Sequence, residues 1–456
     1  MREYDLIVVG GGSGNMIFGP ELDDWKCVIV EEDKFGGTCL HRGCVPSKMY
    51  VVAADVARTV QDASHLDVQA TYHGVEWTRL RDRIFDRLDP TDERGAAFRR
   101  RSGVDVFRDT ARFVAPKVLD VGGEQLTARH VVVAVGSRPC IPPIPGLDAV
   151  PYLTSDDVMR IDALPASMIV IGGGFIAAEM GHVFSSFGTE VTILQRSDRL
   201  LMAEDVDVST RFTELVRHRM GVATGVTVLQ VEAVGAGVRV TWTDAAGTVT
   251  TRDAERLLVA TGRVPNQDRI DAAAGGLAVD EHGHIAVDAH FRTAVDGVWA
   301  FGDVANHTQL KHMANAEMRV VRHNLVHPDA LRTLGHPYVP HAVFSHPQVA
   351  AVGMTEAEAR ASGREIRVAS RKYAETAYGW ALDDTSSFVK VIADAHDRTL
   401  LGAHIIGPDA VVLLQPLLQA MMLGQTADEV AHDVLYVHPA LTEVVEQALL
   451  ALEFRA

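Results

Sequence analysis

The chain has 456 residues with a formal net charge of −17 at pH 7, and 47% of its residues are hydrophobic. A chain of this length is too long for a single hydrophobic core, so we expect roughly three domains of about 150 residues each. The negative charge argues against nucleic acid or an anionic membrane as a partner, and no segment offers the roughly 20 uninterrupted apolar residues of a membrane span.

The first predicted element is a strand over residues 5–9, which is continuously apolar after Asp5. Such a run is typical of a strand buried on both faces of a parallel sheet. Because the strand starts so early, the N-terminus lacks the apolar stretch of a signal peptide, and we expect a cytoplasmic protein. The strand leads into a glycine-rich turn that contains Gly10, Gly12, Ser13 and Gly14. When a helix follows, such a turn lets the backbone approach a pyrophosphate, although glycines also form ordinary turns.

An acidic residue supports the dinucleotide interpretation. Glu31 ends the next apolar strand, 21 residues after Gly10, where a carboxylate would bind an adenosine ribose. The alternative is a solvated acid at a strand end. Asn15 stands where the fingerprint has its third glycine, so helix and strand should pack less closely there.

The most informative segment lies at residues 36–48 and contains Cys39 and Cys44, five positions apart. Pro46 fits the first turn of a helix that begins near Cys44, and a helix N-terminus favours thiolate character. These features suit a reversible dithiol in a reducing cytosol. The alternatives are two free thiols or a metal site, for which His41 and two cysteines would leave the coordination incomplete, so we expect no metal.

Other cationic and cysteine positions have ordinary interpretations. We expect Arg99-Arg100-Arg101 to form a solvated loop, and we expect Cys27 and Cys140 to be structural. With only four cysteines, the chain has too few for a disulfide scaffold of this size.

A second strand-turn-helix unit begins with the apolar run 168–171 and continues through Gly172 and Gly174. The following strand, 190–194, ends in Gln195-Arg196 instead of an acid. Loss of the carboxylate and gain of Arg196 favour the 2′-phosphate of NADP over NAD, although a surface arginine can also be without function. Pro/Gly-rich stretches at residues 139–146 and 336–340 indicate breaks. We expect domains at 1–150, 151–268, 269–335 and 336–456.

Several motifs are distributed along the whole chain. They are Gly-Gly-Thr-Cys39…Gly-Cys44-Val-Pro-Ser-Lys48, Ala260-Thr-Gly-Arg-Val-Pro-Asn266, Ala300-Phe-Gly-Asp-Val304, Val343-Phe-Ser-His-Pro347 with Val352-Gly-Met-Thr-Glu356, and His438-Pro-Ala-Leu-Thr-Glu443. Through these motifs the chain resembles the flavoprotein disulfide reductases from end to end. The resemblance implies an α/β fold with two Rossmann-like dinucleotide-binding domains and a C-terminal α+β dimerisation domain. It implies FAD and NADPH as cofactors, with NADH less favoured, and a homodimer that shares its active sites.

The resemblance also implies roles for individual residues. Cys39 would attack the substrate disulfide, Cys44 would stack on the flavin, and His438, held by Glu443, would be the acid–base residue that reaches the partner subunit's cysteines. Asp303 would bind the flavin's ribityl chain, and a helix starting near Lys311-His312 would point its positive end at the flavin ring. Lys48 and Glu179 would pair near flavin N5. Further cofactor contacts are expected at Gly37, Thr38, Gly136, Ile176, Gly262, Arg263 and Gly302.

Four segments indicate a narrower resemblance: Gly12-Ser-Gly-Asn15, Gly174-Phe-Ile-Ala-Ala-Glu179, Ala377-Tyr-Gly-Trp-Ala381 and His438-Pro-Ala-Leu441. In these segments the chain resembles the mycothione reductases within this family. The expected substrate is therefore mycothione, a small-molecule disulfide. Two alternatives remain open: an NAD-dependent dihydrolipoamide dehydrogenase, and a flavoprotein that binds nucleotides without catalysis.

Overall fold

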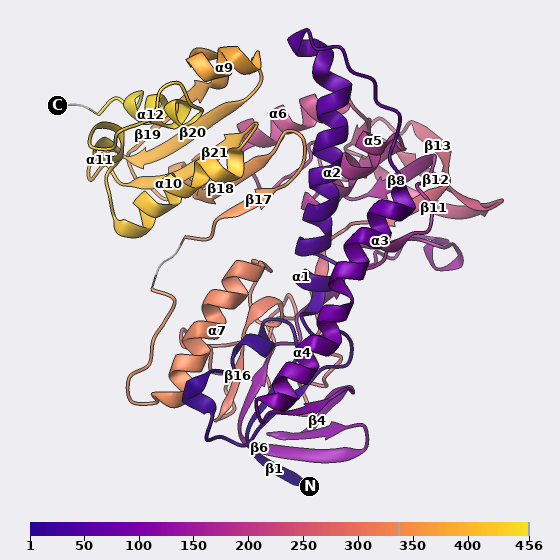
Figure 1. Ribbon diagram of the computed structural model, residues 1–456, viewed down its shortest axis with the longest axis vertical. Coiled ribbons are helices and arrows are strands. Elements are labelled where there is room, and N and C mark those ends of the chain that lie inside the picture. Colours follow the sequence, from indigo (N-terminus) through magenta and orange to yellow (C-terminus); the bar gives the residue numbers. More distant parts are fainter. Residues whose placement is uncertain (336–337, 455–456) are drawn as a thin grey trace. The chain divides into compact units, whose positions relative to one another are not determined.

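The computed structural model describes residues 1–335 and 338–454, which form two compact units. The first unit contains residues 1–47, 78–140 and 262–335, and the second contains 48–77, 141–261 and 338–454. The predicted break at 336–340 and the predicted domain 336–456 extend over positions 336, 337, 455 and 456, which lie outside the described residues. Figure 1 follows the chain by colour.

A seven-stranded sheet forms the centre of the first unit, in the order β3-β2-β1-β6-β5-β4 with β16 also paired to β6. Strands β1, β2, β3, β6 and β16 pair in parallel, whereas β4 and β5 pair antiparallel. The strands are β1 (Arg2–Val9), β2 (Cys27–Val30), β3 (Asp105–Phe107), β4 (Ala111–Ala115), β5 (Val118–Val121), β6 (Glu124–Val133) and β16 (Val298–Ala300).

Strand β1 is buried on both faces, as its continuous apolar run predicts. Ile7 and Val9 belong to one core cluster, whereas Leu6 and Val8 belong to another. Alternate side chains of a strand point to opposite faces, so both faces of the sheet are covered. The other ordered elements of this unit are α1 (Gly37–His41), α4 (Pro90–Arg101), α7 (Lys311–Val326) and a small sheet of β7 (Ser137–Pro139) with β15 (Arg263–Pro265). Two further helices, α2 (Cys44–Asp62) and α3 (Trp77–Leu88), have residues in both units.

The second unit contains a four-stranded parallel sheet in the order β10-β9-β8-β14 and a three-stranded antiparallel sheet in the order β11-β12-β13. The elements are β8 (Ser167–Ile171), α5 (Phe175–Phe187), β9 (Glu190–Gln195), α6 (Val206–Arg217), β10 (Gly221–Thr224), β11 (Thr227–Val234), β12 (Gly237–Thr243), β13 (Val249–Ala254) and β14 (Arg256–Val259). The predicted strand-turn-helix order is confirmed here by β8, the glycine turn and α5.

The C-terminal part of the second unit is an antiparallel sheet in the order β17-β18-β21-β20-β19 with helices packed on it. Its elements are β17 (His341–Val343), β18 (Val349–Gly353), α8 (Glu356–Ala361), β19 (Ile366–Lys372), α9 (Ala377–Leu382), β20 (Phe388–Asp394), β21 (Leu400–Ile406), α10 (Ala410–Leu423), α11 (Ala427–His432) and α12 (Thr442–Leu450). This mixed arrangement agrees with the expected α+β character.

Residues 48–77 depart from the expected domain 1–150, because they group with the second unit. Tyr50 explains this grouping: its hydroxyl donates to the Met159 carbonyl at 2.7 Å, and its ring stacks on Trp77 at a centroid distance of 5.1 Å. Residues 269–335, by contrast, group with residues 1–47.

The helix expected after the first glycine turn is absent from the described structure. Two 3-10 turns, η1 (Gly14–Met16) and η2 (Pro20–Leu22), connect β1 to β2 instead. Gly19 is extended at φ −156° before Pro20, and a proline disfavours the helical conformation in the residue that precedes it. The proline therefore limits any helix after the glycine turn to the few residues before Gly19.

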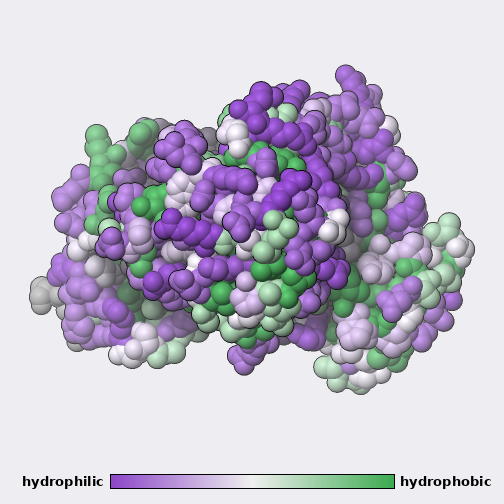
Figure 2. Space-filling view, turned by 90° about the horizontal axis from the view of Figure 1, so that it is seen from below, coloured by the Kyte–Doolittle hydropathy of each residue, from purple (hydrophilic) through white to green (hydrophobic). Residues whose placement is uncertain are grey.

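Most side chains on the face shown in Figure 2 are hydrophilic, with hydrophobic residues in smaller patches. Among the residues that the structure describes, no helix combines the length and apolar character that crossing a membrane requires.

Candidate active site

The first glycine turn lies at the carboxyl end of β1 and contacts the cysteine loop through its backbone. Gly37 has φ +61°, and a Cβ there would lie 2.8 Å from the Cα of Gly12. The Gly36 N–H donates to the Gly11 carbonyl at 2.9 Å. The predicted dinucleotide turn and the predicted redox loop are therefore neighbours within the first unit.

Close packing requires a residue without a side chain at two other positions of this turn. Gly10 has φ +106°, and a Cβ there would lie 2.3 Å from the Ala134 carbonyl oxygen. A Cβ on buried Gly14 would lie 3.0 Å from side-chain carbons of Ala134 and Val8. A residue with a side chain would push the turn away from the sheet at either position.

We predict that Gly37→Ala destabilises the protein and weakens flavin retention. The left-handed backbone alone costs roughly 1–2 kcal/mol for a residue with a Cβ, and the contact with Gly12 adds to that cost. The matched control is Gly103→Ala in the same unit, which has φ +79° but where an added Cβ would meet no atom within 4 Å. Thermal unfolding and bound flavin would be measured for both variants. Equal losses in the two would show that the contact between the turns is unimportant.

Asn15, the departure from the glycine fingerprint, is held by Arg99. The Arg99 guanidinium donates through Nε to Asn15 Oδ1 at 2.7 Å and through Nη2 to the Asn15 carbonyl at 2.5 Å. Burial lowers the pKa of Arg99. The expectation of a solvated arginine loop is therefore wrong, since residues 99–101 end helix α4 and Arg99 is half-buried against the turn.

Glu31 follows β2 and binds backbone N–H groups of the glycine turn. Its carboxylate accepts hydrogen bonds from Gly11 and from Asp33, the latter at 2.8 Å. Burial raises the pKa of Glu31, and these two hydrogen bonds oppose that effect. A cleft lined by Gly10, Glu31, Arg269 and neighbouring residues opens beside the carboxylate. The turn and its acid thus frame a space at the carboxyl edge of the parallel strands, where nucleotides bind in this type of sheet.

The two cysteines occupy different helices. Cys39 is half-buried on α1, whereas Cys44 is exposed and is the first residue of α2, as the position of Pro46 predicts. The His41 ring is buried, and its Nε2 lies 2.8 Å from the Phe35 carbonyl oxygen. His41 therefore secures the backbone of the loop.

Lys311 places a cation near the glycine turn. From the sequence, this residue is identified only as the start of a helix. Its Nζ donates to Ser13 Oγ at 2.8 Å. Burial lowers the pKa of Lys311, and the nearby sulfurs of Cys39 and Cys44 and the Asp303 carboxylate act in the opposite direction. Lys311 and the N-terminus of α2 both bring positive charge to the part of the first unit that holds the two cysteines.

Asp303 lies on the 3-10 turn η6 (Gly302–Val304), shortly before α7. Ser137 Oγ donates to its carboxylate at 2.7 Å, and Arg263 donates to Ser137 Oγ at 2.8 Å. The Gly302 N–H donates to the buried Glu317 carboxylate at 2.7 Å, which fixes the turn from the other side. The predicted residues Gly302, Asp303 and Arg263 are thus connected in one polar network.

Two other predicted glycines of this unit are in left-handed conformations. Gly136 has φ +67°, and its carbonyl accepts from the Asn266 N–H at 3.0 Å. Gly262 has φ +113°, and its carbonyl accepts from the Cys140 N–H at 2.9 Å. The Thr38 carbonyl accepts from Arg42 at 3.0 Å within the cysteine loop.

The second glycine turn belongs to the second unit and has the helix that the first one lacks. Gly172 has φ +119°, and a Cβ there would lie 2.2 Å from the Ala260 carbonyl oxygen. Gly174 precedes α5, a Cβ there would meet open space, and Ile176 is the second residue of this helix. Arg196 is exposed at the end of β9, where the sequence predicts a phosphate contact.

Lys48 and Glu179 form the expected ion pair within the second unit. Lys48 Nζ donates to both carboxylate oxygens of Glu179 at 2.7 Å and lies 4.4 Å from the centre of the Phe344 ring. The buried Glu179 carboxylate also accepts from the Phe344 N–H at 3.1 Å. Each charge thus has a second favourable contact that orients it.

His438 and Glu443 form a second preorganised pair in this unit. His438 Nδ1 lies 2.7 Å from Glu443 Oε1, and the Ala440 N–H donates to Glu443 Oε2 at 3.1 Å. The hydrogen bond with His438 holds the pKa of Glu443 below its usual value. The His438 side chain is 72% exposed while Glu443 is only 14% exposed, so the ring is presented to solvent with its Nδ1 engaged.

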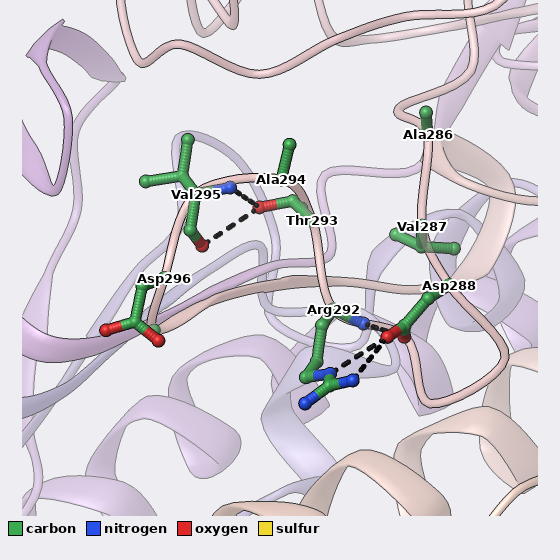
Figure 3. Close-up of a pocket in the computed structure, with 9 residues that line it drawn as sticks. Ala286, Val287, Asp288, Arg292, Thr293, Ala294, Val295 and Asp296 are labelled. Atoms are coloured by element: carbon green, nitrogen blue, oxygen red, sulfur yellow. Dashed lines mark hydrogen bonds and ion pairs between the residues drawn. The ribbon is translucent and has the colours of Figure 1, made fainter.

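A further pocket, shown in Figure 3, contains none of the predicted site residues. It is lined by residues 286–288 and 292–297, where Arg292 pairs with Asp288 at 2.8 Å and Thr293 and Val295 hydrogen-bond to each other. These contacts are internal to two turns and indicate a structural role.

Comparison with known families decides the assignment of this site. The family model "Pyridine nucleotide-disulphide oxidoreductase" matches residues 4–319, and its dimerisation domain matches residues 339–449. The chain belongs to the pyridine nucleotide-disulphide oxidoreductase family. This membership confirms the expected enzyme class and fold class, and it implies FAD and a pyridine nucleotide as cofactors.

Individual relatives cover nearly the whole chain. A mycothione reductase of Mycobacterium tuberculosis is 44% identical over 99% of this chain and 100% of its own length. The dihydrolipoyl dehydrogenase 2 of Haloarcula marismortui is 34% identical over 98% of this chain and 96% of its own length. The solved structure of the HOCl-induced flavoprotein disulfide reductase RclA from Escherichia coli shares the fold, with a TM-score of 0.87 at 24% identity over 99% of this chain and 100% of that one.

Proposed function

We propose that the protein is an FAD-containing, NADPH-dependent mycothione reductase that acts as a homodimer. The observation that carries this proposal is the contact of the Cys39–Cys44 loop with the first glycine turn, where Lys311 donates a hydrogen bond to Ser13. The 44% identity to a mycothione reductase over essentially the full length supports the substrate, and the match of residues 339–449 to a dimerisation domain supports the dimer.

The residues present fit FAD in the first unit. Gly10 and Gly37 permit backbone approaches that a Cβ would block, and the buried Glu31 carboxylate borders a cleft at the strand ends. The polar network of Asp303 offers further contacts. Bound FAD would supply the route by which two electrons of NADPH reach the Cys39–Cys44 disulfide.

The chain's own residues then carry out disulfide exchange. The Cys39 thiolate attacks one sulfur of mycothione, which forms a mixed disulfide and breaks the substrate S–S bond. His438 of the partner subunit gives its proton to the departing thiolate, and Glu443 holds the ring in position. The Cys44 thiolate next attacks the Cys39 sulfur, which restores their disulfide and releases the second mycothiol. The second mycothiol leaves as a thiolate and takes its proton from solvent, so each cycle consumes two electrons and two protons and yields two thiols.

For the nicotinamide nucleotide, we propose that Arg196 binds the 2′-phosphate of NADPH. We expect Arg196→Ala to raise KM for NADPH by about 10-fold or more, because a hydrogen bond to a charged group contributes about 1.5–3 kcal/mol. KM for NADH should stay unchanged. Arg217→Ala is the control, since Arg217 is exposed on α6 and bonds only to Thr224 in the described structure. Equal changes for both nucleotides would contradict this role for Arg196.

The substrate is tested by steady-state assays of mycothione, lipoamide and glutathione disulfide with NADPH and with NADH. The 34% identity to a dihydrolipoyl dehydrogenase makes an NAD-linked lipoamide reaction the second candidate. Turnover with mycothione and NADPH far above the other combinations supports the proposal. Comparable turnover of lipoamide with NADH would assign the second function instead.

A further inference from the structure

A cluster of Asp280, His284 and His307 lies in the first unit, outside the residues assigned to catalysis. One ligand atom from each side chain falls within 4.8 Å of the other two. It is the one such group of three or more His, Cys, Asp or Glu side chains found among the described residues. We propose that these three side chains bind a divalent transition-metal ion of the zinc class.

The distances around Asp280 suit a shared ion. Asp280 Oδ2 lies 3.1 Å from His307 Nε2 and 3.5 Å from His284 Nδ1. Ligand atoms of a tetrahedral zinc site stand about 3.3 Å apart, given bond lengths of about 2.0–2.1 Å. The two imidazole rings have centroids 4.1 Å apart, so a small rotation of exposed His307 would close the third distance.

The buried member of the cluster gives independent support. The His284 side chain is only 8% exposed, and neither of its ring nitrogens has a hydrogen-bond partner among the described residues. The contact between His284 Nδ1 and Asp280 Oδ2, at 3.5 Å, is longer than a normal hydrogen bond. Burying an imidazole whose nitrogens make no hydrogen bond is costly, and a metal ion would satisfy the nitrogen that faces Asp280.

The backbone already holds Asp280 in place for this role. Its Oδ1 accepts from the His282 and His284 N–H groups, both at 2.9 Å, which leaves Oδ2 directed at the two rings. Two imidazoles with one carboxylate are typical ligands of zinc and its neighbours, whereas magnesium and calcium prefer all-oxygen sites. His307 is exposed, which leaves an open path for the ion.

The ion would join two segments next to η6. The Ile285 N–H donates to the Val304 carbonyl at 2.8 Å, and His307 lies three residues after that turn. Binding would therefore cross-link the turn at residues 280–284 to the loop that leads into α7. Because the ion binds the folded state, it should raise the unfolding temperature.

The test is a calorimetric titration of the FAD-loaded, chelator-treated protein with ZnCl₂. A Cys39→Ser Cys44→Ser background removes the redox cysteines as ligands. We expect one equivalent to bind, with the affinity reduced at least about 10-fold by His307→Ala and by Asp280→Asn. Both substitutions should also abolish the rise in unfolding temperature with Zn²⁺, and Mg²⁺ should cause none.

His282→Ala is the matched control, because His282 is exposed beside His307 but outside the cluster. It should leave the affinity unchanged. His307 is exposed, so its loss does not threaten folding. No binding, or equal binding in all these variants, would overturn the proposal, as would an anomalous zinc peak located elsewhere in the crystallised protein.

Discussion

Cys39→Ser is expected to lower disulfide reduction to the background rate while the flavin stays reducible by NADPH. A serine hydroxyl cannot replace a thiolate as the nucleophile near neutral pH, because its pKa is far higher. Cys39 lies on the short helix α1, which begins at Gly37, and the contact of that glycine with Gly12 does not involve the Cys39 side chain, so an isosteric change there should preserve the fold. Disulfide turnover and anaerobic flavin absorbance would be measured side by side.

Cys140→Ser is the control for this prediction. Cys140 is half-buried after β7, outside the 36–48 loop, and we expect its substitution to leave turnover unchanged. Persistent disulfide reduction in Cys39→Ser would remove Cys39 from the mechanism.

His438→Ala is expected to lower turnover by about 10²–10⁴-fold, which is the usual contribution of a positioned acid–base group. Reduction of the flavin by NADPH should be unaffected, since the loss concerns protonation of the departing thiolate. Glu443→Gln should have a smaller effect, because the ring remains but loses the carboxylate bonded to its Nδ1. A near-normal rate in His438→Ala would contradict the assignment.

Mixed dimers test whether His438 acts across the subunit interface. A dimer of one Cys39→Ser subunit and one His438→Ala subunit keeps one complete site if the histidine serves the partner's cysteines. About half of the wild-type activity should then return. If the histidine serves its own subunit, both sites are incomplete and the mixed dimer stays inactive.

Local features of the site could be predicted from the sequence because short segments determine them. The apolar run before Gly10 predicts β1, and Pro46 predicts a helix that begins near Cys44. The contact between His438 and Glu443 is implied by the family resemblance and is present at 2.7 Å. The Lys48–Glu179 pair is implied by the family resemblance and is present at 2.7 Å.

Features that depend on distant segments could not be predicted. Arg99 holds Asn15 from 84 positions away, and Lys311 reaches Ser13 from 298 positions away. The sequence around either residue does not indicate which distant residue it will contact. The missing helix after Gly14 is a different case, because the sequence contains evidence for and against it. The glycine motif predicts a helix, whereas Gly19-Pro20 disfavours one.

The central claim is that electrons from the nicotinamide arrive at the sulfurs of Cys39 and Cys44. The protein would be treated anaerobically with one equivalent of NADPH, alkylated, and its cysteines mapped by mass spectrometry against an untreated sample. We predict two newly alkylated cysteines per chain, at positions 39 and 44. Unchanged labelling at these two positions, or new labels only at Cys27 and Cys140, would contradict the claim.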